Sequence, residues 1–182
     1  PPYRLHVSGL EPLGPRLLRV QLSGDLTGFP EGSVASHIKL FFKRPGQTEL
    51  RLPTRGPKGV VWPARELCPV ARTYSVSAFD AAAQVVSVDF VLHGDSGPAT
   101  RWASTAALGD ELGLAGPGGP NPMLGAAQRY LLVGDLTALP AISGLLAIMP
   151  AGVQATVLLE AAAPDDMFVL SHPPSVNVRW FF

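Results

Sequence analysis

The sequence predicts a six-stranded antiparallel β-barrel followed by a smaller α/β domain with a parallel sheet. Three observations support this fold class. Short alternating apolar and polar runs, separated by glycine and proline turns, fill the first 119 residues. A Gly-Pro helix start near residue 98 interrupts these runs once. After a stretch rich in proline and glycine at 116–125, the order becomes strand, helix, strand, which is typical of a parallel sheet.

The barrel strands follow from period-two alternation. In the clearest run, Val86, Val88 and Phe90 fall on one face, while Ser87 and Asp89 fall on the other. We expect a hairpin connection at 80–83 and a helix at 98–106 that caps one end of the barrel. The loop at 45–67 is long, and ordered loops of that length are often functional. The predicted strands cover residues 3–10, 16–23, 36–42, 70–79, 85–93 and 111–115.

The α/β domain is predicted from the last third of the chain. Strands are expected at 129–133, 153–160 and 176–182, with a helix at 137–149 and a helical turn at 165–170. The predicted organisation is therefore a barrel domain at 1–119, a linker at 120–128 and an α/β domain at 129–182. This second domain is short, as expected if it is incomplete.

Composition limits the possible functions. The formal net charge is zero, which argues against a nucleic-acid partner. The single cysteine, Cys68, cannot form an internal disulfide, so a reducing compartment, the cytoplasm, is expected. The four histidines are widely spaced and no HExxH pattern occurs, so no protein-bound metal site is predicted. No run reaches the ~18 apolar residues of a membrane helix, so stable membrane insertion is not expected.

Arg72 and Tyr74 are two residues apart on a predicted strand, so their side chains share a face. An aromatic ring beside a guanidinium suits a flat cofactor that also carries phosphate. Ser75 adds a hydroxyl and an N–H group beside them. Gly-Pro-Ala-Thr at 97–100 places small residues at a helix N-terminus, where free N–H groups favour a phosphate. The alternative is ordinary cross-strand packing and an ordinary helix start.

Gly134 and Asp135 follow a predicted strand and precede a predicted helix, which is where α/β sheets bind nucleotides. A GxGxxG pattern is missing. The segment is therefore equally consistent with a tight turn in which Asp135 or Thr137 caps the helix.

Basic residues are concentrated in one segment. Seven of the fourteen lysine and arginine residues lie between positions 39 and 65, whereas Glu49 is the one acidic residue of that segment. A positive potential there would suit an anionic ligand, although a solvated loop is the alternative. The seven are Lys39, Lys43, Arg44, Arg51, Arg55, Lys58 and Arg65.

Taken together, the motifs of this chain resemble the siderophore-interacting protein family. They are R-T-Y-S at 72–75, D-F-V-L-H-G at 89–94, G-P-A-T-R-W-A at 97–103, G-D-E-L-G-L-A-G-P-G-G at 109–119 and G-D-L-T-A-L-P-A-I at 134–142. The family consists of FAD-dependent ferric-siderophore reductases related to the ferredoxin-reductase superfamily. Two positions depart from its pattern. Ser77 replaces a second arginine of many members, and Leu136 replaces the usual glutamate.

The resemblance implies a monomeric enzyme that reduces ferric siderophores with electrons from NADPH or NADH and releases ferrous iron. Catalysis would be flavin-mediated, with no catalytic side chain. His93 would lie near the flavin or serve as a structural histidine. Implied FAD contacts are Arg72, Thr73, Tyr74, Ser75, Asp89, Phe90, Val91, Leu92, His93, Pro98, Ala99, Thr100 and Arg101. Implied NAD(P)H contacts are Gly134, Asp135, Thr137, Ala138, Leu139 and Pro140, and siderophore contacts are Lys39, Lys43, Arg44 and Arg55.

Two other functions fit the same scaffold. One is a flavin reductase with a different electron acceptor. The other is a non-catalytic module that binds flavin or siderophore, which Leu136 and the short second domain favour.

Overall fold

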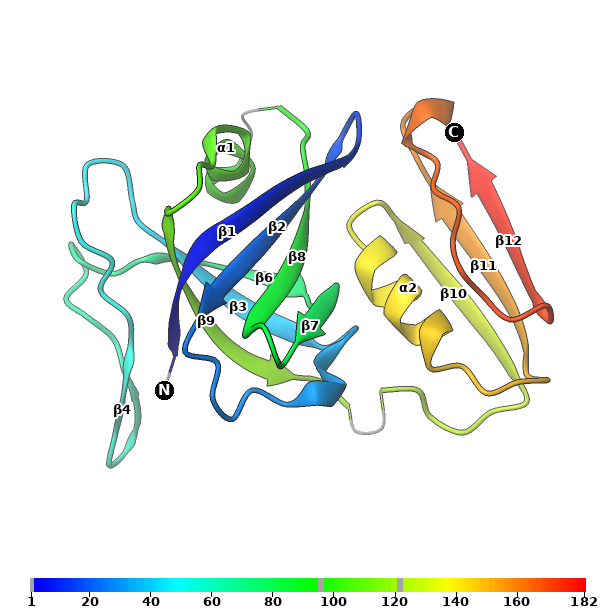
Figure 1. Ribbon diagram of the computed structural model, residues 1–182, viewed down its shortest axis with the longest axis horizontal. Coiled ribbons are helices and arrows are strands. Elements are labelled where there is room, and N and C mark those ends of the chain that lie inside the picture. Colours follow the sequence, from blue (N-terminus) through cyan, green and yellow to red (C-terminus); the bar gives the residue numbers. More distant parts are fainter. Residues whose placement is uncertain (1, 95–96, 121–122) are drawn as a thin grey trace.

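The computed structural model describes residues 2–94, 97–120 and 123–182. An antiparallel barrel forms the first part of the chain, and an α/β unit with a parallel sheet forms the second (Figure 1). The predicted fold class is therefore confirmed. Helix α2 lies between the parallel sheet and the barrel (Figure 1).

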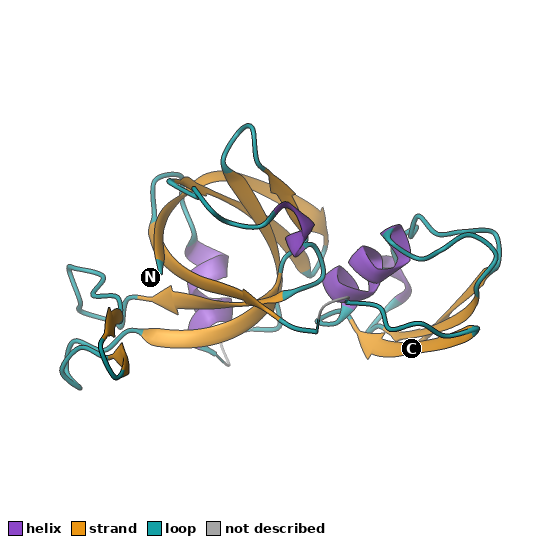
Figure 2. Cartoon of the chain, turned by 90° about the horizontal axis from the view of Figure 1, so that it is seen from below, coloured by secondary structure: helices purple, strands orange, loops and turns teal. Residues whose placement is uncertain are grey.

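One bent strand closes the barrel. The seven-stranded sheet has the order β6-β3-β9-β1-β2-β8-β7, so β6 and β7 are its two edges. Yet only Val76 and Ser77 separate them in the chain. The Val76 N–H donates to the Ser36 carbonyl at 2.9 Å, and the Ser77 N–H donates to the Ser87 carbonyl at 2.9 Å. The sheet thus joins its own two edges, and Figure 2 shows the resulting ring of strands.

Six strands were predicted for the barrel, and six segments build it once β6 and β7 are taken as one bent strand. The bend at 76–77 was not predicted from the alternation of 70–79. The bounds are β1 Tyr3–Gly14, β2 Leu17–Gly24, β3 His37–Phe42, β6 Val70–Ser75, β7 Ala78–Asp80, β8 Val85–Val91 and β9 Glu111–Gly118.

Alternate side chains fill the barrel interior. Ile38, Leu40 and Phe42 of β3 point inward, whereas His37 and Lys39 are exposed. Helix α1 (Pro98–Thr105) covers one end of the barrel, as predicted. Its Trp102 ring packs against Phe42 and Phe90, with centroids 5.3 and 5.5 Å apart. The interior is therefore a packed apolar core.

The long loop after β3 carries a short hairpin that projects from the barrel (Figure 1). Its strands are β4 (Thr54–Gly56) and β5 (Gly59–Val61). A 3₁₀ turn, η1 (Glu31–Ser33), precedes β3.

The α/β unit contains three parallel strands in the order β10-β11-β12. The predicted helix at 137–149 is two residues shorter at each end, and the predicted helical turn at 165–170 is the 3₁₀ turn η2. Residues 121–122 of the predicted linker lie outside the described part of the chain. The bounds are β10 Arg129–Asp135, α2 Leu139–Ala147, β11 Gln154–Glu160, η2 Pro164–Asp166 and β12 Val176–Phe181.

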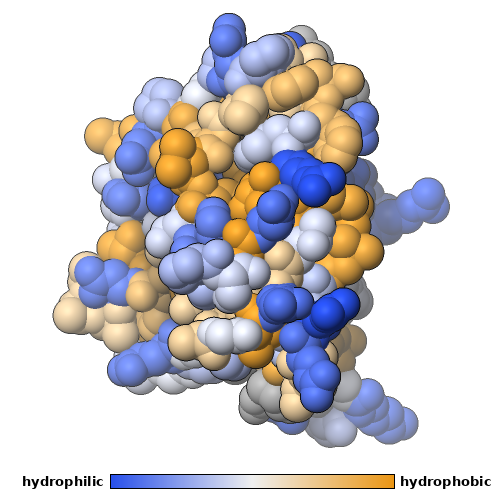
Figure 3. Space-filling view, turned by 90° about the vertical axis from the view of Figure 1, so that its right-hand side faces the viewer, coloured by the Kyte–Doolittle hydropathy of each residue, from blue (hydrophilic) through white to orange (hydrophobic). Residues whose placement is uncertain are grey.

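Within the described ranges, one face of this parallel sheet is covered and the other is open. Helix α2 buries Val157 and Leu159 of β11, whereas Leu131 and Val133 on the opposite face of β10 are each 64% exposed. Figure 3 views the side of the molecule formed by the α/β unit and shows apolar surface among the polar side chains. None of the helices in the described ranges combines the length and the apolar character needed to cross a bilayer.

The barrel and the α/β unit pack closely. A Cβ atom at Gly144 of α2 would lie 2.7 Å from the Ala35 Cβ and 2.9 Å from a Val34 methyl. The Phe168 ring contacts Gly14, and Arg16 lies 3.7 Å from the Asp166 carboxylate. Glycine at 144 therefore permits an approach that any other residue would prevent.

We predict that Gly144→Ala lowers the stability of the protein. In an unconstrained helix interior this change should stabilise by about 1 kcal/mol, so the contact with Ala35 must reverse the sign. Urea unfolding measures the difference. Ser143→Ala, one residue earlier on the same helix, is the control, with an expected gain of up to about 0.5 kcal/mol. A gain in Gly144→Ala as large as in the control would contradict the tight packing.

Candidate functional site

The site predicted from Arg72 and Tyr74 forms on one face of β6. Pairing with β3 places Tyr74 opposite Ile38 and Arg72 opposite Leu40, both of which are buried. The Tyr74 ring lies 4.5 Å from the Phe90 ring of β8, at a 40° tilt. Phe90 in turn contacts Trp102 of α1. An aromatic series therefore joins β6, β8 and α1, as the order of the motifs suggested.

The environment of Tyr74 keeps its hydroxyl neutral. Burial raises the pKa of the Tyr74 phenol to about 12, and the nearby Arg72 charge opposes this shift. A half-buried neutral ring presents an apolar surface for stacking, with an O–H group available for hydrogen bonding. The exposed Arg72 guanidinium donates to the adjacent Ala71 carbonyl at 2.8 Å.

The first turn of α1 is suited to an anion. Gly97 is extended and provides no side-chain cap, and Pro98 has no N–H group. Gly97 therefore gives the N–H groups of Ala99 and Thr100 no capping acceptor, and among the residues that the structure describes no side chain replaces it. The Thr100 hydroxyl lies 3.3 Å from His93 Nε2, at the end of β8. The Arg101 N–H is used within the helix, where it donates to the Gly97 carbonyl at 3.0 Å.

Not every predicted flavin residue lies with this group. Thr73 and Ser75 alternate to the opposite face of β6. The Asp89 carboxylate also faces away from Phe90, and Arg19 holds it with two hydrogen bonds of 2.8 and 2.9 Å. The Leu92 N–H donates to the Arg16 carbonyl at 2.7 Å. Val91 packs against the apolar core of the α/β unit.

We tested whether these residues fit a flat cofactor that carries phosphate. The structure provides a half-buried aromatic ring and an exposed guanidinium on one face of β6, and the ring is linked through Phe90 and Trp102 to α1, whose N-cap residue offers no capping side chain. Each has the chemistry that such a cofactor requires: stacking, charge pairing and N–H donors to phosphate. The residues therefore fit this type of cofactor.

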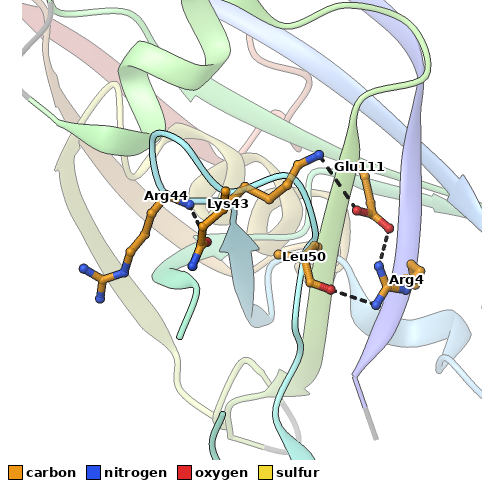
Figure 4. A network of polar contacts seen from close by, with 6 residues as sticks. Arg4, Lys43, Arg44, Leu50 and Glu111 are labelled. Atoms are coloured by element: carbon orange, nitrogen blue, oxygen red, sulfur yellow. Dashed lines mark hydrogen bonds and ion pairs between the residues drawn. The ribbon is translucent and has the colours of Figure 1, made fainter. Parts of the chain in front are cut away.

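The four basic residues predicted to bind substrate separate into two pairs. Lys39 and Arg55 line one cavity of about 880 Å³ between the hairpin and the outer barrel wall. Lys43 instead approaches the Glu111 carboxylate at 4.0 Å (Figure 4). The Arg44 guanidinium donates to the Cys68 carbonyl at 2.8 Å. Trp62 and Phe41 line the same cavity. Sequence reasoning missed both, although an exposed tryptophan in a proline-rich loop is an available signal.

The residues predicted to bind NAD(P)H also fall into two groups that line different cavities. Gly134, Asp135 and Ala138 line a cavity of about 580 Å³ at the carboxyl ends of the parallel strands, together with Glu160 and Phe181. Leu139 and Pro140 instead line a cavity of about 250 Å³ between α2 and the barrel. Arg19, Ser77 and Asp89 form its barrel side, and no sequence signal predicted their convergence.

Local packing explains the sequence of the turn into α2. A Cβ atom at Gly134 would lie 2.4 Å from the Ala138 Cβ, so only glycine fits. The Asp135 carboxylate accepts from the Thr137 N–H at 2.8 Å and from its hydroxyl at 2.5 Å. These bonds, the hydroxyl first, lower the pKa of Asp135, while partial burial acts in the opposite direction. Leu136 is 6% exposed and belongs to the apolar core under the sheet.

The closed antiparallel barrel, the helix that caps it and the following parallel-sheet unit make up a fold of the ferredoxin-reductase type. The family description "Siderophore-interacting FAD-binding domain" matches residues 6–121, and "Siderophore-interacting protein" matches residues 127–182. The chain belongs to the siderophore-interacting protein family.

Three similar proteins illustrate the relationship. The ferric vibriobactin reductase ViuB of Vibrio cholerae is 42% identical over 165 residues, which cover 90% of this chain and 60% of ViuB. The NADPH-dependent ferric-chelate reductase of Escherichia coli is 32% identical over 183 residues, 97% of this chain and 69% of that protein. The crystal structure of SipS from Aeromonas hydrophila superposes with a TM-score of 0.86 at 38% identity, covering 99% of this chain and 67% of SipS. This chain therefore spans 60% of the length of ViuB.

We predict that Asp135→Ala destabilises the α/β unit in a pH-dependent way. Because the pKa of Asp135 is lowered in the folded state, its stabilising effect is present above the unfolded pKa of about 3.9 and is lost as the pH falls through the folded value. The stability difference from the parent should be clear at pH 7 and should shrink at and below about pH 4.

Urea unfolding over this pH range measures the effect. Asp165→Ala, which removes an exposed carboxylate from η2, serves as the control and should change stability little. A constant difference between Asp135→Ala and the parent across the range would rule out the proposed role of the ionised carboxylate.

Proposed function

We propose that this chain forms the FAD-binding barrel and part of the NAD(P)H-binding unit of a reductase that transfers electrons to ferric siderophores. The observation that carries the proposal is the aromatic series that runs from Tyr74, on the same face of β6 as Arg72, through Phe90 to Trp102 of α1. The match of residues 6–121 to a siderophore-interacting FAD-binding domain supports it. So do the names of the relatives, which are ferric-chelate and ferric vibriobactin reductases.

In this proposal each residue of the site has a distinct role. Tyr74 stacks on the flat ring system and excludes water from it. Arg72 and the N–H groups of Ala99 and Thr100 hold the pyrophosphate. The Ser75 N–H is a donor toward the ring, and His93 and Thr100 border the cofactor together. Bound FAD supplies the conversion of a two-electron hydride donor into single-electron transfers.

The remaining partners follow from the same geometry. The carboxyl ends of β10, β11 and β12, with Gly134 and Asp135, are the proposed place for NADPH or NADH. The basic segment with Lys39 and Arg55 is the proposed place for the anionic ferric siderophore. Ferrous iron binds hard anionic oxygens less tightly than ferric iron, so reduction would release it. All the flavin residues come from one chain, so a monomer suffices, and we place its action in the cytoplasm.

We predict that Arg72→Ala strongly lowers FAD retention. Loss of charge-assisted hydrogen bonds to phosphate should cost about 1.5–3 kcal/mol, or roughly tenfold or more in affinity. The ratio of flavin to protein absorbance and a flavin fluorescence titration measure this. Arg65→Ala, an exposed arginine of the long loop, is the matched control. Unchanged flavin content in Arg72→Ala would contradict the placement of the pyrophosphate.

We further predict that the flavin of the complete protein is bleached on anaerobic mixing with NADPH or NADH. A ferric siderophore should then restore the oxidised spectrum faster than free flavin does. A flavin that stays oxidised with both nucleotides would favour a binding module, because the buried Leu136 leaves no acidic side chain at that position. Equal rates with ferric siderophore and free flavin would instead indicate a flavin reductase.

A further inference from the structure

The largest of the described cavities lies outside both proposed nucleotide sites. It occupies about 880 Å³ between the β4–β5 hairpin and the outer face of β3, β6 and β9. This volume is within the range of about 300–1,000 Å³ typical of small-molecule sites. The flavin residues Arg72 and Tyr74 lie on the opposite face of the same strand, β6.

The wall of the cavity combines aromatic surface with positive charge. The Phe41 and Trp62 rings meet edge to face, with centroids 5.9 Å apart and planes at 70°. Phe41 is buried, whereas Trp62 is 50% exposed and so presents an open ring surface. Lys39 and Arg55 bring two cations to the same space, and no acidic residue is found among the described residues that line it.

The two cations differ in how they are held. The Lys39 ammonium donates to the Thr73 hydroxyl of the neighbouring strand, which fixes it on the barrel wall. Arg55 is on the hairpin and forms no ion pair with any residue in the described ranges. An anionic ligand would therefore gain a charge partner without displacing an existing one.

The segment that carries the hairpin is fixed to the barrel on one side, and its two ends are bonded to each other. On the barrel side, Arg4 pairs with Glu111 and donates to the Leu50 carbonyl at 2.9 Å, and Lys43 also approaches Glu111 (Figure 4). Within the segment, Gln47 near its start donates to the Glu66 carbonyl near its end at 3.0 Å. A cavity fixed in this way requires little ordering when a ligand binds.

We propose that this cavity binds a planar aromatic ring that carries anionic oxygens, and that the ring is a catecholate arm of the ferric siderophore. The ring would lie against Trp62, and Arg55 and Lys39 would contact its oxygens. Trp62 then determines specificity, because a hydroxamate chelate has no aromatic ring to place there. This inference rests on the proposed function for its substrate class. An adenine nucleotide also combines an aromatic ring with anionic oxygens and is the other possible ligand of this type.

Binding of redox-inert gallium(III) complexes tests the proposal without any electron transfer. The probes are a gallium tris-catecholate, a gallium tris-hydroxamate and 2′,5′-ADP, each titrated calorimetrically into the complete protein. We expect Trp62→Ala and Arg55→Ala each to weaken tris-catecholate binding about tenfold. Trp62→Phe, which keeps a ring, should stay within about threefold of the parent. Tris-hydroxamate binding should be insensitive to Trp62→Ala.

Lys58→Ala is the matched control for Arg55→Ala. It removes the same charge from the turn of the same hairpin but lies outside the cavity lining, so its effect should stay below about twofold. Equal losses in Lys58→Ala and Arg55→Ala would overturn the cavity as the site. A loss of 2′,5′-ADP binding in Trp62→Ala with unchanged tris-catecholate binding would overturn the assignment to the siderophore.

Flavin content and bleaching by NADPH, measured on the same variants, separate this inference from the proposed function. A parent protein that binds the tris-catecholate but is not bleached would reject the reductase and leave the cavity assignment standing. A parent that is bleached but does not bind the tris-catecholate would reject the cavity assignment alone.

Discussion

The contact between Tyr74 and Phe90 depends on the bend that closes the barrel. Before the bend, β6 pairs with β3, and after it β7 pairs with β8, so the same strand holds both edges of the sheet. Near the point where the strand changes its pairing partner from β3 to β8, its Tyr74 ring packs against the Phe90 ring of β8. The backbone hydrogen bonds of Val76 and Ser77 fix this crossing. The proposed cofactor face thus results from the way in which the barrel closes.

The two faces of β6 are chemically different. Arg72 and Tyr74 share one face, where the Tyr74 ring contacts Phe90, while Thr73 faces outward and holds the Lys39 ammonium. Because successive side chains of a strand alternate, one short segment can serve a cofactor on one side and an anionic ligand on the other. A strand of this kind would keep the two ligands a short distance apart without a shared pocket.

The contact between the barrel and the α/β unit is close and combines apolar packing with polar groups. Gly144 allows α2 to approach Val34 and Ala35, whereas Arg19 and Asp89 pair beside it in the cleft. The Ser77 hydroxyl is buried there without a hydrogen-bond partner in the described part of the chain. Many family members carry an arginine at this position, so its replacement by serine changes the polar content of the cleft directly.

The sequence by itself determined the strands, the capping helix, the strand-helix-strand order and the family, because periodicity and turn residues are local properties. It also predicted that Arg72, Tyr74 and the start of α1 form one site, since their order along the chain is distinctive. Only the tertiary structure decided the bend at 76–77, the separation of Lys39 and Arg55 from Lys43 and Arg44, and the turning of Asp89 toward Arg19. Each of these depends on contacts between residues far apart in the chain, and local patterns carry no information about which distant partner a side chain meets.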